Sequence, residues 1–180
     1  MKKEEAIKVI TGCAKKYRLN LENKNLLFVF DNSGRVESIE AVFLPGNFLH
    51  LTGIRCDHLS GKHFYQKCLD GRLSPSDVEL TKSGTTEMKL QVLPLITDIH
   101  KTAKMLGDYN HSKTELFTDK LAGNVKACLG FVRSGNYYVP NTVLREDIRD
   151  LTTVPTKRIL AIFRKESGAK FYRENTYLAT

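Results

Sequence analysis

A change in sequence pattern near Met105 constrains the fold more than any other feature. Before it, apolar residues mostly recur at steps of three and four, as in amphipathic helices. After it, short apolar runs alternate with turn residues, which is typical of an antiparallel strand meander. Together the two patterns predict an α+β fold in which N-terminal helices pack on an antiparallel sheet of about four to six strands. The strand-like runs are residues 116–118, 125–132, 137–139, 158–163 and 170–178.

Turn and capping residues predict the other elements. Asp31-Asn32-Ser33-Gly34 is a strong turn signal and predicts a β-hairpin over residues 25–44. Ser60 predicts the N-cap of a helix that runs to about residue 70. Pro94 should kink or split the helical stripe at residues 88–103. Three more helices are expected, namely residues 2–18, a short helix that opens at Ser74-Pro75, and residues 143–151.

No repeat, low-complexity segment or linker divides the 180 residues, which suffice for one well-packed core. We expect one compact unit, with residues 1–44 as an N-terminal helix and hairpin layer and residues 45–180 as the main α+β domain. The charged N-terminus lacks the apolar core of a signal peptide, and no apolar run reaches the roughly 20 residues that span a bilayer. We expect a cytoplasmic protein without membrane contact, in which the four cysteines stay reduced.

Charge is the most informative property of the composition. Lysine and arginine number 28 against 20 acidic residues, which gives a formal net charge of +8 and a pI of about 9.3. An excess of this size attracts polyanions and speeds their association, so nucleic acid is an expected partner. Alternatively, the excess of positive charge only keeps the protein soluble. Net charge alone does not show whether the partner is DNA or RNA, or whether the protein is an enzyme or only binds nucleic acid.

Residues 47–54, Asn-Phe-Leu-His-Leu-Thr-Gly-Ile, place polar side chains inside an apolar, strand-like run. His50 and Thr52 are two residues apart, which puts both side chains on one face of a strand. Gly53 then allows a bend or the close approach of another group. Histidine exchanges protons near neutral pH, so His50 is a candidate acid or base. A histidine in such a run is about as often a satisfied, half-buried residue.

The sequence lacks the common nucleotide-binding and hydrolase motifs. Gly-x-Gly-x-x-Gly, the Walker A loop, Gly-x-Ser-x-Gly and His-Glu-x-x-His are all absent. The cysteines and histidines do not have structural-zinc spacing, and the acidic residues lie mostly on helix-like or turn-like stretches. We therefore expect no metal site and no cofactor, and any catalysis should use metal-free chemistry.

Metal-free RNA cleavage needs a base for the 2′-hydroxyl proton, an acid for the leaving oxygen, and cations for the charge that develops at phosphorus. The chain offers all three kinds of group, and RNA is the favoured target. The candidates for catalysis are His50, Thr52, Lys62, Tyr138 and Arg164. The candidates for nucleic-acid binding, where aromatic and cationic side chains suit base stacking and phosphate contact, are His63, Tyr65, Arg133, Tyr137, Arg158 and Lys165.

Five short motifs resemble one phage-associated family. It is the fourth group of phage-type nucleases related to barnase, EndoU, colicin and RelE-like toxins, and the resemblance covers about residues 40–165. It implies N-terminal helices on a four-stranded antiparallel sheet and a metal-independent, toxin-like RNase activity carried by mobile elements. Only His50 and Thr52 match a motif of the family closely enough for the family's functional roles to be assigned to them. The motifs are residues 48–54 (Phe-Leu-His-Leu-Thr-Gly-Ile), 64–65 (Phe-Tyr), 106–110 (Leu-Gly-Asp-Tyr-Asn), 130–131 (Gly-Phe) and 138–142 (Tyr-Val-Pro-Asn-Thr).

Two other function classes remain open at this point. A histidine followed two residues later by threonine in an apolar strand is also similar to the opening of ADP-ribosyltransferase-like domains, which implies that His50 binds the NAD ribose. Tyr138 with Glu166 or Glu174 would then complete the site, although no clear catalytic-glutamate motif is present. The third class is a non-catalytic basic module that binds nucleic acid, or a protein partner or inhibitor. A concave site that brings His50 close to a cation would favour an enzyme, and a flat basic face would favour a binding module.

Overall fold

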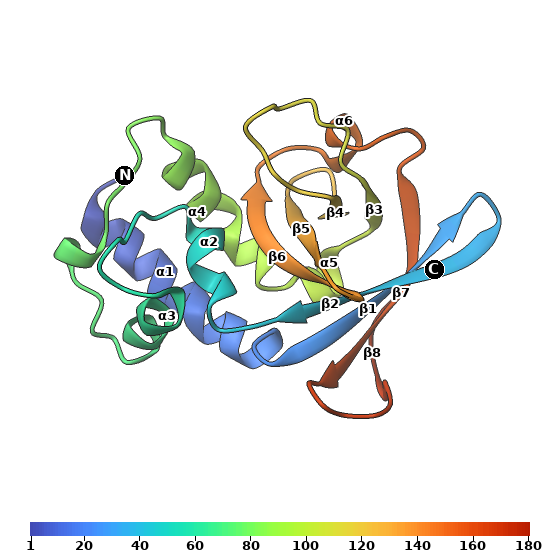
Figure 1. Cartoon of the computed structure of the whole chain (residues 1–180), viewed down its shortest axis with the longest axis horizontal. Coiled ribbons are helices and arrows are strands. Elements are labelled where there is room, and N and C mark those ends of the chain that lie inside the picture. The colour runs from blue at the N-terminus through green and yellow to red at the C-terminus, as the bar shows by residue number, and fades with distance from the viewer.

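The computed structural model describes all 180 residues, from Met1 to Thr180. The helices within residues 3–20 and 47–96 gather on one side of the molecule and the strands curl into a barrel on the other (Figure 1). None of the helices is both long and apolar enough to cross a membrane. The elements in chain order are α1 (Lys3–Asn20), β1 (Lys24–Asn32), β2 (Arg35–Phe43), α2 (Asn47–Thr52), α3 (Gly61–Leu69), the 3-10 helix η1 (Pro75–Asp77), α4 (Thr85–Ile96), α5 (Ile99–Thr102), β3 (Met105–Asp108), β4 (Lys120–Gly123), β5 (Cys128–Ser134), β6 (Tyr137–Leu144), α6 (Ile148–Leu151), β7 (Lys157–Glu166) and β8 (Glu174–Leu178).

The α+β class, with helices packed on the strands, is confirmed, but the expected sheet of about four to six strands is wrong, because the sheet has eight strands and is closed. Its order is β1-β2-β6-β5-β4-β3-β7-β8, and β1 also pairs with β7, which closes a seven-stranded barrel with β8 as an additional strand. All pairs are antiparallel except β2 with β6, which are parallel through a bridge between Ala41 and Tyr138. The physical reason is that both outer edges of the β1–β2 hairpin find partners. Each of the seven strands therefore has a neighbouring strand on both sides.

The helices cover one part of the barrel wall. Helices α2 and α4 contact β6, and α1 lies against α3 and α4. The rings of Tyr17, Phe48 and Tyr65 meet where α1, α2 and α3 join, with centroids 5.2 to 5.6 Å apart. One core of 34 buried residues, from Ala6 to Ile162, runs through this helical layer into the barrel. Residues 1–44 and residues 45–180 both contribute to it.

Several local predictions are confirmed. Residues 25–44 form the β1–β2 hairpin, and the carboxylate of Asp31 accepts the Gly34 N–H at 2.7 Å across its turn. The Ser60 hydroxyl accepts the His63 N–H at the start of α3. The helical stripe at residues 88–103 is split, because α4 ends at Ile96, just after Pro94, and α5 begins at Ile99.

Other local predictions are wrong. Residues 47–52 form the helix α2 and not a strand, since Phe48, Leu51 and Thr52 are buried at helical spacing and Gly53 ends the helix with a left-handed φ of 68°. Residues 116–118 are a loop, while the four-residue strands β3 and β4 were not expected. Ser74-Pro75 opens only the 3-10 helix η1. Of residues 143–151, only the last four are helical.

Candidate active site at the barrel mouth

Charged side chains occupy inward positions at one end of the barrel. Phe131 points inward, because its ring packs on Phe28 and Phe43 at centroid distances of 6.0 and 6.3 Å. Lys120 is paired directly with Phe131, and Asp108 with Lys120. Residues that face each other in antiparallel strands share one side of the sheet, so Lys120 and Asp108 also point inward. At this end of the barrel, ionisable side chains therefore occupy inward positions that are apolar elsewhere.

Lys157 lies at an inward position by the same reasoning. It is paired with Leu106, which is fully buried in the core. Its Nζ lies 5.4 Å from the ring centroid of Phe30, and the Nζ of Lys120 lies 5.8 Å from that of Tyr138. We define the barrel mouth as Phe30, Asp108, Lys120, Tyr138 and Lys157. These residues come from five different strands, where β1 and β3 end and β4, β6 and β7 begin.

The two ammonium groups of the barrel mouth share one carboxylate. Lys120 Nζ donates to Asp108 Oδ1 in a short contact, and Lys157 Nζ lies 3.6 Å from Asp108 Oδ2. The lysine side chains are only 17% and 18% exposed, whereas that of Asp108 is 47% exposed. Partly buried ammonium groups need such a counter-ion, because leaving a charge unpaired away from water is costly. The cluster carries two positive charges and one negative charge, a surplus of one.

Asp108 is ionised at neutral pH. Partial burial acts to raise the pKa of its carboxyl group, but the hydrogen bond from Lys120 and the charges of Lys120 and Lys157 outweigh it, and the pKa lies below its ordinary value. The mouth therefore holds a carboxylate that can accept a proton and two ammonium groups that can stabilise an oxyanion. Tyr138 adds an aromatic face of the kind on which a base can stack.

Three of the predicted site residues lie at or beside the barrel mouth. Tyr138 belongs to it, and Arg133 is paired with Tyr138 across β5 and β6, on the same side of the sheet. Arg133 is exposed at the rim, as is Tyr137 next to Tyr138. The structure places Arg133 and Tyr138 side by side, and their roles in catalysis and nucleic-acid binding stay predictions.

The helical candidates lie elsewhere. His50 is exposed on α2, and its backbone carbonyl accepts a hydrogen bond from Lys89 Nζ at 3.2 Å. Thr52 is fully buried and its hydroxyl donates to the Leu49 carbonyl at 2.7 Å, so it closes the helix and does not share a strand face with His50. Tyr65 is also buried, and donates to Ala14 and Glu22. Lys62 and His63 are exposed on α3.

The basic residues of β7 are mostly engaged far from the mouth. Arg164 forms two hydrogen bonds with the carboxylate of Glu174, and Lys165 pairs with Glu40 at 3.5 Å. Arg164 lies roughly 23 Å along β7 from Lys157, at about 3.3 Å per residue. Arg158 donates to the carbonyl of Thr180. The structure does not bring these residues together with His50.

Sequence reasoning missed Asp108, Lys120 and Lys157 as site residues. Asp108 lies in the motif at residues 106–110, but nothing in that motif alone indicates two lysine partners. A detectable signal exists at β4, where Lys120 precedes buried Ala122 by two residues and therefore shares its face. The pairing of three short strand ends is visible only in the folded chain.

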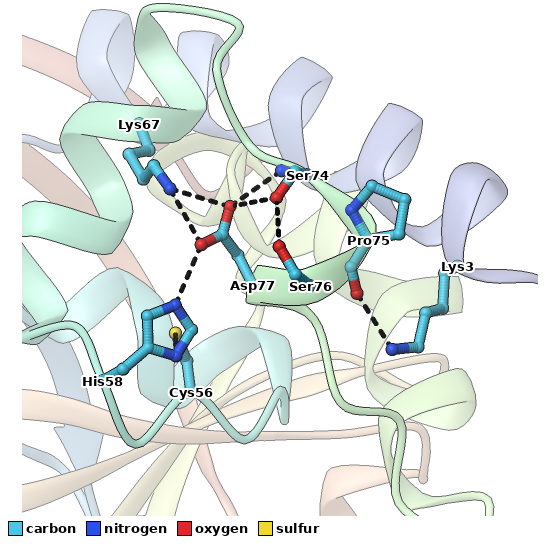
Figure 2. Close-up of polar contacts among 8 residues, drawn as sticks. All are labelled: Lys3, Cys56, His58, Lys67, Ser74, Pro75, Ser76 and Asp77. Carbon is cyan, nitrogen blue, oxygen red and sulfur yellow. Dashed lines mark hydrogen bonds and ion pairs between the residues drawn. The ribbon is translucent and has the colours of Figure 1, made fainter.

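A second polar cluster surrounds the buried carboxylate of Asp77 (Figure 2). Lys67 Nζ donates to both of its oxygens at 2.8 and 2.9 Å, and His58 Nε2 lies 2.9 Å from Oδ1. The Ser74 hydroxyl and N–H donate to Oδ2 at 2.8 and 2.9 Å. These bonds tie the segment after α2, helix α3 and η1 to one point.

The same cluster superficially resembles a nucleophile–histidine–carboxylate triad, since Cys56 Sγ lies 3.9 Å from His58 Nδ1. Burial raises the pKa of the Cys56 thiol, so the sulfur is a neutral thiol and a poor nucleophile. Asp77 is already engaged by Lys67 and Ser74 as well as by His58. We therefore interpret the cluster as a structural anchor.

Asp77→Asn should lower the free energy of unfolding at pH 7 by about 3 kcal/mol, because it weakens several charged hydrogen bonds around a buried group. Burial acts to raise the pKa of Asp77, but the hydrogen bonds from Lys67, His58 and Ser74 outweigh it and hold the pKa well below its usual range. The stabilisation is present above the unfolded pKa of about 3.9 and is lost as the pH falls below it. Urea unfolding between pH 6 and 3 should show the gap between wild type and variant shrinking. A gap that widens with acid, or one shared by the exposed Asp57→Asn control, would contradict this account.

The site and the fold together define a class of protein. A basic α+β chain whose barrel presents cations, a carboxylate and an aromatic ring at one end has the groups that engage a nucleic-acid backbone. The chain belongs to the family described as phage-Barnase-EndoU-ColicinE5/D-RelE like nuclease4, whose model matches residues 9–180. This confirms the resemblance and extends it from about residues 40–165 to the first helix, the hairpin and the C-terminus. No curated protein and no solved structure matches the chain.

The ADP-ribosyltransferase-like alternative loses its main support. It required His50 and Thr52 on one face of a strand, and both residues lie in helix α2. The two glutamates considered for it are in ion pairs, Glu166 with Lys24 and Glu174 with Arg164. The family match supports a nuclease-type function instead.

Proposed function

We propose that the protein is a metal-independent endoribonuclease whose active site is the barrel mouth. The observation that carries the proposal is the carboxylate of Asp108, half exposed between two mostly buried ammonium groups at inward positions of the barrel. Charged residues replace apolar ones in the interior of a barrel at a cost in stability, and such departures from the local pattern are typical of functional sites. Membership of the nuclease-like family supports the same reading.

The chemistry follows from the three charged groups. Asp108 accepts the proton of a ribose 2′-hydroxyl, whose oxygen then attacks the adjacent phosphorus. Lys120 stabilises the negative charge that develops on the phosphate oxygens. Lys157, which has the longer contact with Asp108, protonates the leaving 5′-oxygen. The products are a 2′,3′-cyclic phosphate and a 5′-hydroxyl. The proton that Asp108 gained then passes to the neutral Lys157, whose Nζ lies 3.6 Å from Oδ2, and this restores both groups without a further reactant.

The proposal also covers how RNA binds and the biological role of the protein. Tyr138 stacks on a base, and Arg133 at the rim contacts the strand that leaves the mouth. The net charge of +8 draws RNA to the surface. We further propose a toxin-like role in a phage or mobile element, action in the cytoplasm, and a protein inhibitor as partner.

His50→Ala should leave RNA cleavage in EDTA within about threefold of wild type, because His50 is exposed on α2 and is not among the residues that form the barrel mouth. An exposed substitution should also leave the free energy of unfolding within about 0.5 kcal/mol. The assay is incubation of mixed RNA with each protein in EDTA, followed by analysis of the product ends. A loss of cleavage of about 100-fold in the folded variant would instead establish His50 as the acid or base predicted from the sequence and would move the active site to α2.

A further inference from the structure

A cavity that shares no lining residue with the barrel mouth lies beside α4. It has a volume of about 550 Å³ and is bounded by the start of α4, the loop at residues 112–116 and the end of β6 with the residues that follow it. Cavities of roughly 300 to 1,000 Å³ are the size that small organic ligands occupy. The nuclease chemistry proposed above does not use it.

The cavity has two cations without an acidic partner. Lys89 Nζ donates to the carbonyl of His50, and no carboxylate lies within salt-bridge distance of it. Arg145 donates only to the neutral amide oxygen of Gln91, at 2.5 Å. The third cation on the wall, Lys113, is paired with Glu146. Lys89 and Arg145 are therefore free to bind an anion from the cavity.

The walls are built by residues that hold specific positions. The stem of Lys89 lies across Gly53, where an added Cβ would come within 2.7 Å of the lysine Cδ. The Tyr109 hydroxyl fixes the loop by accepting the Lys113 N–H at 2.8 Å and donating to the Lys113 carbonyl at 3.1 Å. Asn110 Oδ1 accepts the Ser112 N–H at 3.0 Å. Parts of two family-like motifs, at residues 48–54 and 106–110, thus shape this cavity.

Besides the carboxylate of Glu115, the rest of the lining suits a sugar and a flat heterocycle. Four hydroxyl side chains, those of Thr85, Ser112, Thr114 and Thr142, line it beside the apolar side chains of Met88 and Leu116. Hydroxyl groups both donate and accept hydrogen bonds, as the hydroxyls of a ribose require. Apolar side chains provide the surface on which a base can lie.

We propose that this cavity binds a nucleoside monophosphate, with Lys89 and Arg145 holding the phosphate and the hydroxyl-lined wall holding the sugar. The ligand is either a free nucleotide or one nucleotide of a bound RNA strand. The binding itself does not depend on cleavage at the barrel mouth, so the proposal stands or falls separately from the nuclease function.

The test is calorimetric titration of the folded protein with adenosine and guanosine 5′-monophosphate, and with inorganic phosphate as a separate probe. Arg145→Gln, an exposed change that the fold should tolerate, and Lys89→Gln should each weaken nucleotide binding by about 10-fold or more. Thr114→Trp should block the cavity, and Lys8→Gln on the exposed face of α1 should change nothing. The titration is repeated in Lys120→Met, so that nucleotide bound at the barrel mouth is distinguished from nucleotide bound in the cavity.

Competition identifies the source of the ligand. If the nucleotide displaces a non-cleavable 2′-O-methyl oligonucleotide, the cavity is a subsite for the RNA strand. If both bind together, it is a separate nucleotide site. Failure of both nucleotides to bind, or unchanged affinity in Arg145→Gln and Thr114→Trp, would overturn the proposal. Inorganic phosphate binding as tightly as the nucleotides would overturn its nucleoside part.

Discussion

Replacing Lys120 by methionine should lower kcat/KM for RNA cleavage by about 10²- to 10³-fold while the protein remains folded. The loss is that expected when a preorganised group that stabilises the transition-state charge is removed from an enclosed site. Methionine keeps most of the length of the side chain and is apolar, so it suits an inward position of the barrel. Asp108 keeps Lys157 as its counter-ion in this variant. The measurement is single-turnover cleavage of a labelled oligoribonucleotide, with the circular dichroism spectrum as the test of folding.

Matched variants separate a specific role from a general loss of charge. Lys8→Met removes one exposed positive charge from α1 and should leave kcat/KM within about twofold of wild type. Asp108→Asn should lower it at least as much as Lys120→Met, since it removes the proton acceptor and the counter-ion of both lysines. If Lys120→Met stays fully active, or if Lys8→Met loses as much activity, the barrel mouth is not the active site.

Phe131→Ala should lower the free energy of unfolding by about 4 kcal/mol, the largest effect on stability that we expect from one change. Phe131 is fully buried, and its ring contacts those of Phe28 and Phe43 inside the barrel. Truncation leaves a cavity bounded by three strands whose positions are fixed by their pairing, so the barrel can collapse only partly. Chemical denaturation measures the change directly.

Phe117→Ala is the natural control for this experiment. Phe117 has the same side chain but is 84% exposed, on the loop before β4. Its removal should change the free energy of unfolding by no more than about 0.5 kcal/mol. Equal losses in the two variants would mean that Phe131 does not pack in the closed barrel described above.

The local structure that could be predicted from the sequence is that fixed by short-range chemistry. The turn at Asp31 and Gly34, the N-cap Ser60 and the amphipathic first helix depend only on neighbouring residues. Helix α2 was mistaken for a strand because six residues barely exceed one and a half helical turns, too few to distinguish the two periodicities. Strands β3 and β4 have four residues each, and their tertiary pairing outweighs weak local preferences.

Closure of the barrel could not be predicted in the same way. It depends on β1 pairing with β7 more than 100 residues later, and on the single parallel bridge between Ala41 and Tyr138. The candidate site likewise depends on pairing between strands that are far apart in the sequence. Tyr138 and Arg133 are predicted from their chemistry, whereas the grouping of Asp108, Lys120 and Lys157 arises from the register of β3, β4 and β7. The sequence pattern therefore shows which side chains could do chemistry, but it does not show which strands pair or in what register.

The most direct test of the central claim uses an oligodeoxynucleotide that contains a single ribonucleotide, incubated with the protein in EDTA. The account predicts one cut, 3′ to the ribose, that leaves a 2′,3′-cyclic phosphate and a 5′-hydroxyl, and no cut in the all-deoxy strand. Cleavage of the all-deoxy strand, cleavage only after Mg²⁺ is added, or no cleavage of ribose-containing strands would contradict it.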